Sequence, residues 1–337
     1  MNTDKVVSLL VDAGHAVRDA VGTFLSEVPR EQRIQVDQIR HSDVIYTIDS
    51  AVEPALTGCL EERAASVGGI LLIAEGIGES EITVYPNSMA PEAAAVRVLM
   101  DPIDGTRPIM HDKRSAFFLA GAMPNGDDPG GLNDLCAAVM VEIPTTRARI
   151  ADTITAIRGE GARGSTHDLW TGTESPDWIP APAATTTIRG GYAQLCRLFP
   201  PGRDMLASLE EQLLERLFPD AAKGEILTFE DQYASSGGQL YELIMGRDLF
   251  IADLRASLYA SPAFAGRRHG HVCHPYDLAA HLVGTETGAV VTDAKGAPLA
   301  APLNTTGAVD WIGYANPAVR DEVAPMLSEL LRERKMI

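Results

Sequence analysis

The sequence predicts a mixed α/β protein built from two closely packed subdomains, and three observations carry this prediction. Its 337 residues exceed the usual size of a single hydrophobic core. Apolar residues recur at helical spacing near both ends: in residues 4–28, where Asn2 or Thr3 can be the N-cap, and in a segment that is capped by Asn316 and runs to about Arg334. Between these helices lie short apolar runs that end in a carboxylate, a proline or a glycine, which is typical of buried strands.

Composition excludes several classes of protein. An apolar content of 45% with 22% charged residues is ordinary for a soluble globular protein. The net charge of −18 argues against a surface that binds nucleic acid or an anionic membrane. The four cysteines form no CxxC pair, which favours reduced thiols. Neither a signal peptide nor a run of about 18 apolar residues is present, so we expect a cytoplasmic protein.

The order of these segments places an antiparallel sheet in the first half of the chain. We expect strands at 41–49, 69–74, 96–100, 115–123, 135–143 and 147–151, with a second helix at 50–66. The run 158–164 looks like a dinucleotide-binding loop, but a polar, proline-rich stretch follows it instead of a capped helix. We therefore interpret it as the junction between subdomains 1–160 and 161–337. The second half is expected to hold helices at 205–217 and after Ser235, with strands at 289–292 and 311–315.

The most informative segment follows the strand at 96–100 and reads Asp101-Pro-Ile-Asp-Gly-Thr106. Two carboxylates three positions apart on a bend repel each other unless a cation lies between them. Oxygen ligands of this kind suit hard divalent cations such as Mg²⁺. Gly105 and Thr106 then offer backbone N–H groups, and a hydroxyl, to a phosphate oxygen. The alternative is that Asp104-Gly105 is a hairpin turn with Asp101 as its solvated shoulder.

Other carboxylates occupy similar positions. Asp49 lies at the start of the helix predicted at 50–66, where it is either a helix cap or a functional group. Glu75 directly ends the strand at 69–74 and is followed by Gly-Ile-Gly-Glu79, so either glutamate could be a ligand. Asp277 opens a later helical segment.

Two further segments carry chemistry-bearing side chains. The histidine-rich run 267–274 suggests zinc, but no partner pair at zinc-finger spacing accompanies it. After the central segment, Arg107, Lys113 and Arg114 form a basic loop that is either solvated or contacts a second anionic group of a substrate.

Together these segments resemble the inositol monophosphatase superfamily, which includes fructose-1,6-bisphosphatases and 3′-phosphonucleotide phosphatases. The central segment resembles its signature. Tyr46-Thr-Ile-Asp49 with Glu53 resembles its Thr-x-x-Asp-x-x-x-Glu element, with Tyr46 in place of the threonine, and Tyr276-Asp277-Leu-Ala-Ala280 resembles its Trp-Asp-x-Ala-Ala element, with Tyr276 in place of the tryptophan. The resemblance covers roughly 1–150 and 235–320. It implies a layered αβαβα sandwich of the inositol monophosphatase type.

The resemblance also implies a site and an activity. Metal ligands would be Glu75, Asp101, the Ile103 carbonyl, Asp104 and Asp277; catalytic residues would be Asp49, Glu75 and Thr106; substrate contacts would be Asp104, Gly105, Thr106, Asp253 and Asp277. Two or three Mg²⁺ ions, with Mn²⁺ as a substitute, would serve a phosphatase acting on a small sugar or inositol phosphate. The alternatives are a fructose-1,6-bisphosphatase, a 3′(2′),5′-bisphosphate nucleotidase, or a catalytically silent phosphate-binding protein. We expect a small phosphorylated metabolite as partner, no nucleic acid or membrane, and a homodimer.

Overall fold

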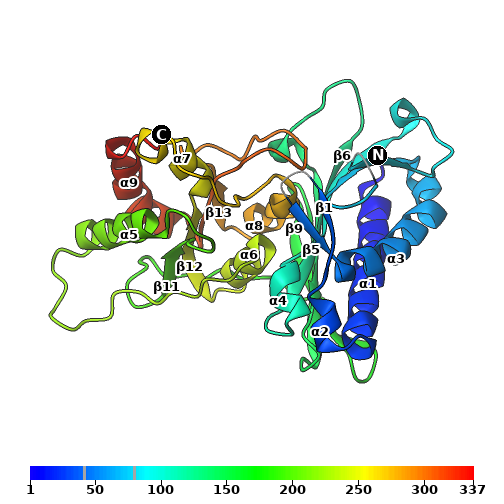
Figure 1. Cartoon of the computed structure of the whole chain (residues 1–337), viewed down its shortest axis with the longest axis horizontal. Coiled ribbons are helices and arrows are strands. Elements are labelled where there is room, and N and C mark those ends of the chain that lie inside the picture. The colour runs from blue at the N-terminus through cyan, green and yellow to red at the C-terminus, as the bar shows by residue number, and fades with distance from the viewer. Residues whose placement is uncertain (41–42, 79–80) are drawn as a thin grey trace.

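The computed structural model describes residues 1–40, 43–78 and 81–337, and its elements stack in five layers (Figure 1). An eight-stranded sheet has the order β10-β9-β8-β7-β6-β5-β3-β4, and a four-stranded sheet has the order β11-β12-β14-β13. α1 and α3 cover one face of the large sheet, α6 and α8 lie between the two sheets, and α5 and α9 cover the far side of the small sheet. The order of layers is therefore αβαβα, as predicted.

The strands of the large sheet are mostly antiparallel, although β3 and β5 pair in parallel. They are β3 (Ile70–Ala74), β4 (Ile82–Tyr85), β5 (Val96–Asp104), β6 (Ala116–Pro124), β7 (Ala137–Ile143), β8 (Ile150–Ile157), β9 (Gly161–Asp168) and β10 (Thr173–Glu174). The small sheet contains β11 (Tyr192–Leu195), β12 (Asp248–Asp253), β13 (Val290–Thr292) and β14 (Trp311–Tyr314), and a separate hairpin pairs β1 (Val36–Arg40) with β2 (Asp43–Tyr46).

The helices of the described residues follow the apolar periodicity of the sequence. They are α1 (Thr3–Glu27), α2 (Arg30–Arg33), α3 (Thr47–Arg63), α4 (Thr106–Met110), α5 (Arg203–Leu217), α6 (Ser236–Ile244), α7 (Arg255–Ala260), α8 (His281–Glu286) and α9 (Pro317–Glu333). Short 3₁₀ turns include η5 (Tyr276–Leu278). Asn2 and Asn316 cap α1 and α9 by accepting backbone hydrogen bonds, as the sequence predicts for helix starts. Among the described residues, no helix has the length and apolarity to cross a membrane.

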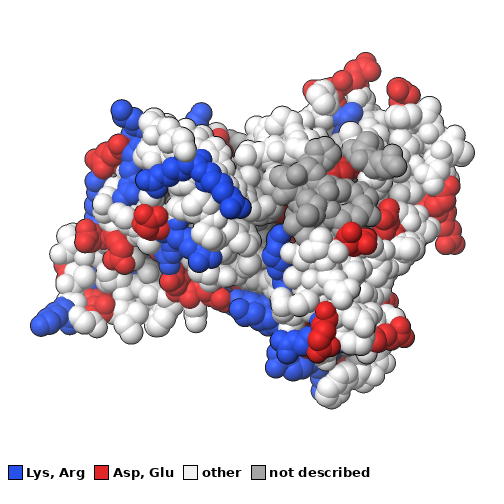
Figure 2. Space-filling view, viewed as in Figure 1, with Lys and Arg blue, Asp and Glu red and all other residues white. Residues whose placement is uncertain are grey.

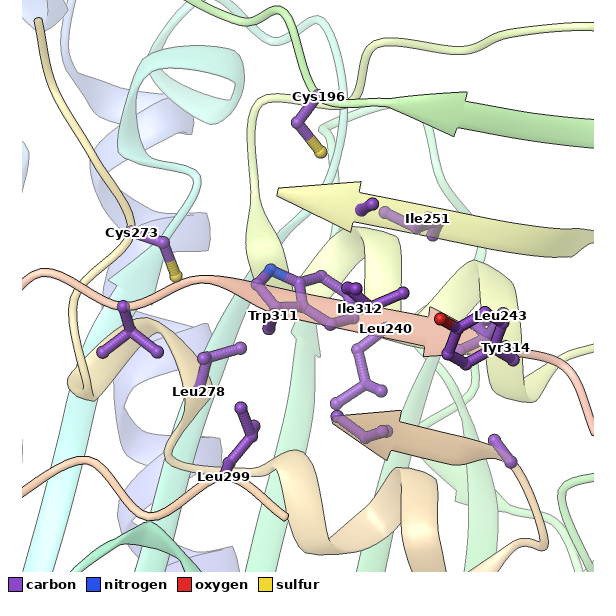
Figure 3. Close-up of a cluster of buried hydrophobic side chains, with 14 of the residues drawn as sticks. Cys196, Leu240, Leu243, Ile251, Cys273, Leu278, Leu299, Trp311, Ile312 and Tyr314 are labelled. Atoms are coloured by element: carbon purple, nitrogen blue, oxygen red, sulfur yellow. The ribbon is translucent and has the colours of Figure 1, made fainter. Parts of the chain in front are cut away.

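Two apolar cores hold the layers together. One lies between α1, α3 and the large sheet, and the other fills the space between the sheets and under α9. In the second core, Leu240 and Leu243 of α6 pack with Ile251 of β12 and with Trp311 and Ile312 of β14 (Figure 3). Burial of such side chains contributes roughly 1.5–3 kcal/mol each, so α6 is held firmly between the sheets.

Three expected boundaries differ from the structure. The strand expected at 96–100 continues to Asp104, because a register irregularity between Asp101 and Asp104 accommodates Pro102, which has no N–H for the ladder. The strand expected at 41–49 ends at Tyr46, and Asp49 lies within the first turn of α3; residues 41 and 42 lie outside the described residues. The strand expected at 147–151 begins only at Ile150 and continues to Ile157.

The run 158–164, interpreted from sequence as a junction, lies inside the large sheet. It forms the turn between β8 and β9 and the first residues of β9. The large sheet continues through β9 and β10 to Glu174, so the expected division at residue 160 falls between two of its neighbouring strands. Alternating hydrophobicity is weak in β9, where glycine, serine and threonine predominate, and this is why the sequence pattern does not reveal the strand.

Candidate active site

The central segment reaches the edge of the large sheet through β5, which is buried along its whole length. Its position between β3 and β6 explains this burial, since both faces and both edges of the strand are covered. Asp101 and Asp104 at its end are only 2% and 6% exposed. Buried carboxylates need partners, so the solvated hairpin shoulder considered from sequence does not describe Asp101.

Gly105 ends β5 in a left-handed conformation, with φ of 94°. A non-glycine residue is strained in this region. A Cβ at this position would also lie 3.1 Å from the Cβ of Ser235, which precedes α6. Glycine therefore allows the chain to turn directly from β5 into α4 while α6 packs closely against it.

α6 holds Asp104 from the opposite side. Ser235 Oγ donates a hydrogen bond of 2.8 Å to Asp104 Oδ2, and the backbone N–H of Gly237 donates to the same oxygen. A Cβ on Gly237 would lie 2.8 Å from that oxygen. The close approach of α6 to the end of β5 thus depends on glycine, and it fixes the direction of the Asp104 carboxylate.

Asp277 arrives from the second half of the chain. It lies in η5 and not at the start of α8, and its Oδ2 accepts a hydrogen bond of 2.6 Å from the backbone N–H of His274. The sequence-based view that Asp277 caps the following helix is therefore replaced by a cap on this short turn. One carboxylate oxygen from each of Asp101, Asp104 and Asp277 lies within 4.8 Å of the other two.

Two of these carboxylates, Asp101 and Asp104, have raised pKa values. Burial raises the pKa of Asp101 well above its ordinary value, and the charges of Asp104 and Asp277 raise it further, against a hydrogen bond from the backbone N–H of Ile103. Burial and the charge of Asp277 raise the pKa of Asp104 to about 7 despite its hydrogen bonds. An all-oxygen set with this much repulsion fits a hard divalent cation, which would neutralise it.

Asp49 and Thr106 lie beside this trio. Asp49 Oδ2 accepts from the backbone N–H of Tyr46, 2.8 Å away, as a capping group of α3. The Thr106 hydroxyl lies 2.8 Å from the Ile103 carbonyl oxygen and 3.4 Å from Asp49 Oδ1. Asp49 can therefore be both a helix cap and a site residue, because its two oxygens face different partners.

One cleft of about 630 Å³ collects most of the predicted residues. Those lining it are Asp49, Glu75, Asp101, Ile103, Asp104, Gly105, Thr106 and Asp277. Glu75 also lines a smaller hollow next to Asp49 and Ile103, and its carboxylate does not join the close trio. Glu79 lies outside the described residues, so only Glu75 of the two glutamates can be placed.

Asp253, the predicted substrate contact, is placed differently. It ends β12, is 1% exposed and does not line the cleft. Its carboxylate receives hydrogen bonds from the Arg255 guanidinium, one of them 2.8 Å from Nε to Oδ1. Arg255 is the residue that lines the cleft. Asp253 therefore acts on the cleft by holding the Arg255 guanidinium in position.

The predicted basic loop is divided between two surfaces. Arg107 lines the cleft, whereas Lys113 and Arg114 line a second cavity. Arg114 forms a 2.5 Å ion pair with Asp231. The three cations therefore cannot act together on one substrate in this structure. On the face shown in Figure 2, basic side chains stand on both sides of the hollow between the two halves, although the chain is strongly acidic.

Several residues that line the cleft could hardly be predicted from the sequence. Phe199 contacts both cleft arginines, with guanidinium carbons 5.8 Å (Arg107) and 5.4 Å (Arg255) from its ring centre. Arg255 follows Asp253 by two positions, which is the only local hint of its role. In the histidine-rich run, His271 lines the cleft, but within the described ranges no histidine or cysteine joins a group close enough to bind a metal.

No protein-family model matches this chain, and no curated protein sequence matches it. Solved structures do match over nearly the whole chain. The extragenic suppressor protein SuhB from Bartonella henselae shares 18% identity with a TM-score of 0.62, covering 96% of this chain and 98% of its own. SuhB from Mycobacterium tuberculosis shares 16% identity with a TM-score of 0.58, covering 97% and 96%.

A third solved structure extends the likeness to a second kind of protein. The fructose-1,6-bisphosphatase of Leishmania major shares 12% identity with a TM-score of 0.66, covering 99% of this chain and 96% of its own. At these identities the likeness concerns the arrangement of the elements, and it agrees with the five layers described above. The chain has the layered αβαβα fold of the inositol monophosphatase and fructose-1,6-bisphosphatase proteins.

Proposed function

We propose that this protein is a Mg²⁺-dependent phosphatase that hydrolyses a small sugar or inositol phosphate. The observation that carries the proposal is the meeting of Asp101, Asp104 and Asp277 beside the first turn of α4. Repelling, buried carboxylates next to an anion-binding helix start are useful to an enzyme only when cations are bound between them. The shared fold with SuhB and a fructose-1,6-bisphosphatase supports the same reaction class.

In this proposal two or three metal ions would share the ligands Glu75, Asp101, the Ile103 carbonyl, Asp104 and Asp277. When bound, they would supply positive charge to the phosphate oxygens and lower the pKa of the attacking water. The four side chains and the carbonyl supply only oxygen ligands, which suits Mg²⁺ and its substitute Mn²⁺ better than zinc.

The chain's own groups have separate parts in the reaction. Gly105 and Thr106 lie at the start of α4, where helix N–H groups have no intrahelical acceptor and can hold phosphate oxygens. The side-chain oxygens of Asp49 and Thr106 are 3.4 Å apart, so one water molecule beside them can contact both and be oriented by them. Attack of that water on phosphorus forms one P–O bond and breaks the ester P–O bond; the water loses one proton, and the released alkoxide takes up one.

A phosphate-release assay over sugar phosphates, inositol phosphates and nucleotides tests the proposal. With Mg²⁺ we expect release from at least one sugar or inositol monophosphate, and treatment with EDTA should abolish it. Undiminished release without metal would exclude the mechanism. If protein loaded with Mg²⁺ or Mn²⁺ binds phosphate esters but releases no phosphate from them, the alternative of a catalytically silent phosphate-binding protein is favoured.

A bisphosphate substrate is the second candidate, because Arg107 and Arg255 both face the cleft. Two guanidiniums around one aromatic ring could hold a second anionic group away from the carboxylates. We expect Arg107→Gln to raise KM for a bisphosphate at least about tenfold, the cost of roughly one charge-assisted hydrogen bond, with a smaller change for a monophosphate.

Lys113→Gln is the matched control for this prediction. Lys113 belongs to the same basic loop but lines the second cavity, so its loss should leave both KM values unchanged. Steady-state kinetics on the two substrates measure the difference. Equal effects of Arg107→Gln on the bisphosphate and the monophosphate would remove the second anion subsite.

Metal affinity is expected to depend on pH. In the metal-free protein the raised pKa of Asp104, about 7, keeps this group partly protonated below neutrality, and a metal must displace that proton. The apparent Mg²⁺ dissociation constant should rise as pH falls below about 7, by up to tenfold per unit for each proton released. Calorimetric titration at several pH values, in buffers of different ionisation enthalpy, measures both the affinity and the proton release.

The same shift has a stability consequence with a definite sign. A carboxyl whose folded pKa is raised above its unfolded value stabilises the folded protein below the unfolded pKa, and this contribution is lost as pH rises. For Asp104 the loss extends from about pH 4 to about pH 7 in metal-free protein. If the Mg²⁺ dissociation constant does not change between about pH 4 and pH 7, the raised pKa of Asp104 does not govern metal binding.

A further inference from the structure

A second cavity lies on the other side of the segment that precedes α6. It is open to solvent and is wider than the cleft described above. Its walls come from the large sheet, from α6 and from the loops after α4 and β7. None of the residues placed in the phosphatase reaction lines it. The cavity is therefore separate from the catalytic cleft and needs its own explanation.

Four basic side chains surround this cavity: Lys113, Arg114, Arg149 and Arg247. Lys113 and Arg114 share the loop after α4, Arg149 precedes β8 and Arg247 follows α6, so the fold gathers them from three separate parts of the chain. In a molecule with net charge −18, such a gathering is unusual. A concentration of cations around one opening attracts an anion and steers it inward.

The acidic groups of the cavity are largely satisfied within the wall. Glu142 accepts from the Ser115 hydroxyl at 2.7 Å and from the backbone N–H of Asp152 at 3.1 Å. The two oxygens of Asp152 accept from the hydroxyls of Thr166 and Tyr241, each at 2.6 Å. Burial raises the pKa of Glu142, which reduces its negative charge. Glu142 and Asp152 therefore repel an anion in the cavity less than two unpaired carboxylates would.

Two of the arginines lie over tyrosine rings. The Arg114 guanidinium carbon lies 3.7 Å from the ring centre of Tyr233, and that of Arg247 lies 5.2 Å from the ring centre of Tyr241. A stacked guanidinium keeps its N–H edge in a fixed direction, which suits bidentate binding of a phosphate. The fixed orientation reduces the entropy lost when a ligand binds.

The ion pairs that these arginines already make are replaceable. Arg114 pairs with Asp231, Arg247 pairs with Glu242 and Arg149 pairs with Asp168. In each pair one partner is about half exposed (46% for Asp231, 52% for Arg247, 59% for Arg149), so solvent screens the attraction. A dianionic ligand can therefore compete with the carboxylates for the same guanidinium edges. The remaining wall is aromatic, with Phe117 and Trp178 beside the two tyrosines.

From this geometry we propose that the cavity is a second binding site, for a small phosphorylated metabolite that carries a planar ring. The phosphate contacts Arg114 and Arg247, and the ring packs against the aromatic wall. Lys113 and Arg149 at the opening add attraction for the anion. The ligand is bound without being hydrolysed, since the cavity contains none of the close carboxylate trio.

Phenylphosphonate is a suitable probe, because it combines an aromatic ring with a dianion and its C–P bond is not an ester. In buffer with EDTA, where the proposed catalytic cleft has no metal to hold a phosphonate, calorimetry is expected to show one saturable site. Inorganic phosphate should compete with the probe but bind more weakly. Absence of saturable binding would overturn the proposal, whether or not the protein is a phosphatase.

Variants locate the site. Arg114→Gln with Arg247→Gln should weaken phenylphosphonate binding at least tenfold. Arg216→Gln is the matched control, because Arg216 is a partly exposed arginine that pairs with Glu333 between α5 and α9. This variant should bind phenylphosphonate with the affinity of the unchanged protein. Ala148→Phe fills the cavity and keeps every charge, so it tests the site if the double variant does not fold. Unchanged affinity in a folded double variant, or in Ala148→Phe, would overturn the proposal.

Discussion

Replacing Asp101 with asparagine is expected to abolish most phosphatase activity, by on the order of a hundredfold or more, while leaving the protein folded. Changes to groups that only support a metal ligand already cost about 10- to 100-fold, and Asp101 is a proposed direct ligand. Asparagine keeps the size of the side chain, and its Oδ1 can still accept the hydrogen bond that Asp101 receives from Ile103 N. The variant removes the charge and little else.

The stability of the same variant gives an independent readout. Asp101 is buried among like charges that raise its pKa, so its removal relieves repulsion in metal-free protein. We therefore expect Asp101→Asn to melt at the same temperature as the unchanged protein or higher in EDTA, and to lose most of the rise that Mg²⁺ produces. Thermal melts with and without Mg²⁺, beside the rate assay, measure both effects.

Asp248→Asn is the control for Asp101→Asn. Asp248 is also buried, at 6% exposure, but it begins β12, whereas the cleft residue Arg255 follows the other end of that strand. This control should keep its activity and its response to Mg²⁺. If Asp101→Asn retains near-normal turnover, or if both variants lose activity alike, the carboxylate trio is not the metal site.

Asp277→Asn is expected to have a comparably large effect through a different route. Asp277 belongs to the second half of the chain, and its carboxylate meets Asp101 and Asp104 at the end of β5. A metal shared by the three would link the two halves and stabilise the native state. A ligand at about a hundred times its dissociation constant contributes about 2.7 kcal/mol, which is visible as a melting shift. The variant should lose this shift together with most of its activity.

The local turn should survive this substitution. Asparagine can accept the hydrogen bond from His274 N that Asp277 Oδ2 now accepts, so η5 keeps its cap. Asp293→Asn is the matched control, because Asp293 likewise accepts backbone hydrogen bonds, from Lys295 and Ala297, in a turn outside the cleft. A normal Mg²⁺ response in Asp277→Asn would show that Asp277 is only a structural cap.

The sequence by itself determined the local features of this protein. Apolar spacing predicted the end helices α1 and α9, and their asparagine caps were readable because capping depends on residues within one turn. The segment from Asp101 to Thr106 indicated carboxylates at a strand end, since a strand, a bend and a glycine are all specified by neighbouring residues. The resemblance of this and later segments to a known superfamily predicted the order of the five layers.

Only the tertiary structure decided which side chains share a cleft. Arg107 lies in α4 and Arg114 in the loop that follows it, yet the two line different cavities. Phe199 reaches the cleft from a segment whose local sequence gives no sign of it, and the only local hint for Arg255 is that it follows Asp253 by two positions. Asp253 faces Arg255 and not the cleft, because the paired guanidinium offsets the cost of burying its charge. The physical reason is that hydrogen-bonding and steric preferences act between neighbours in sequence, whereas the direction of a side chain is set by the packing of two sheets and a helix that meet only in the folded protein.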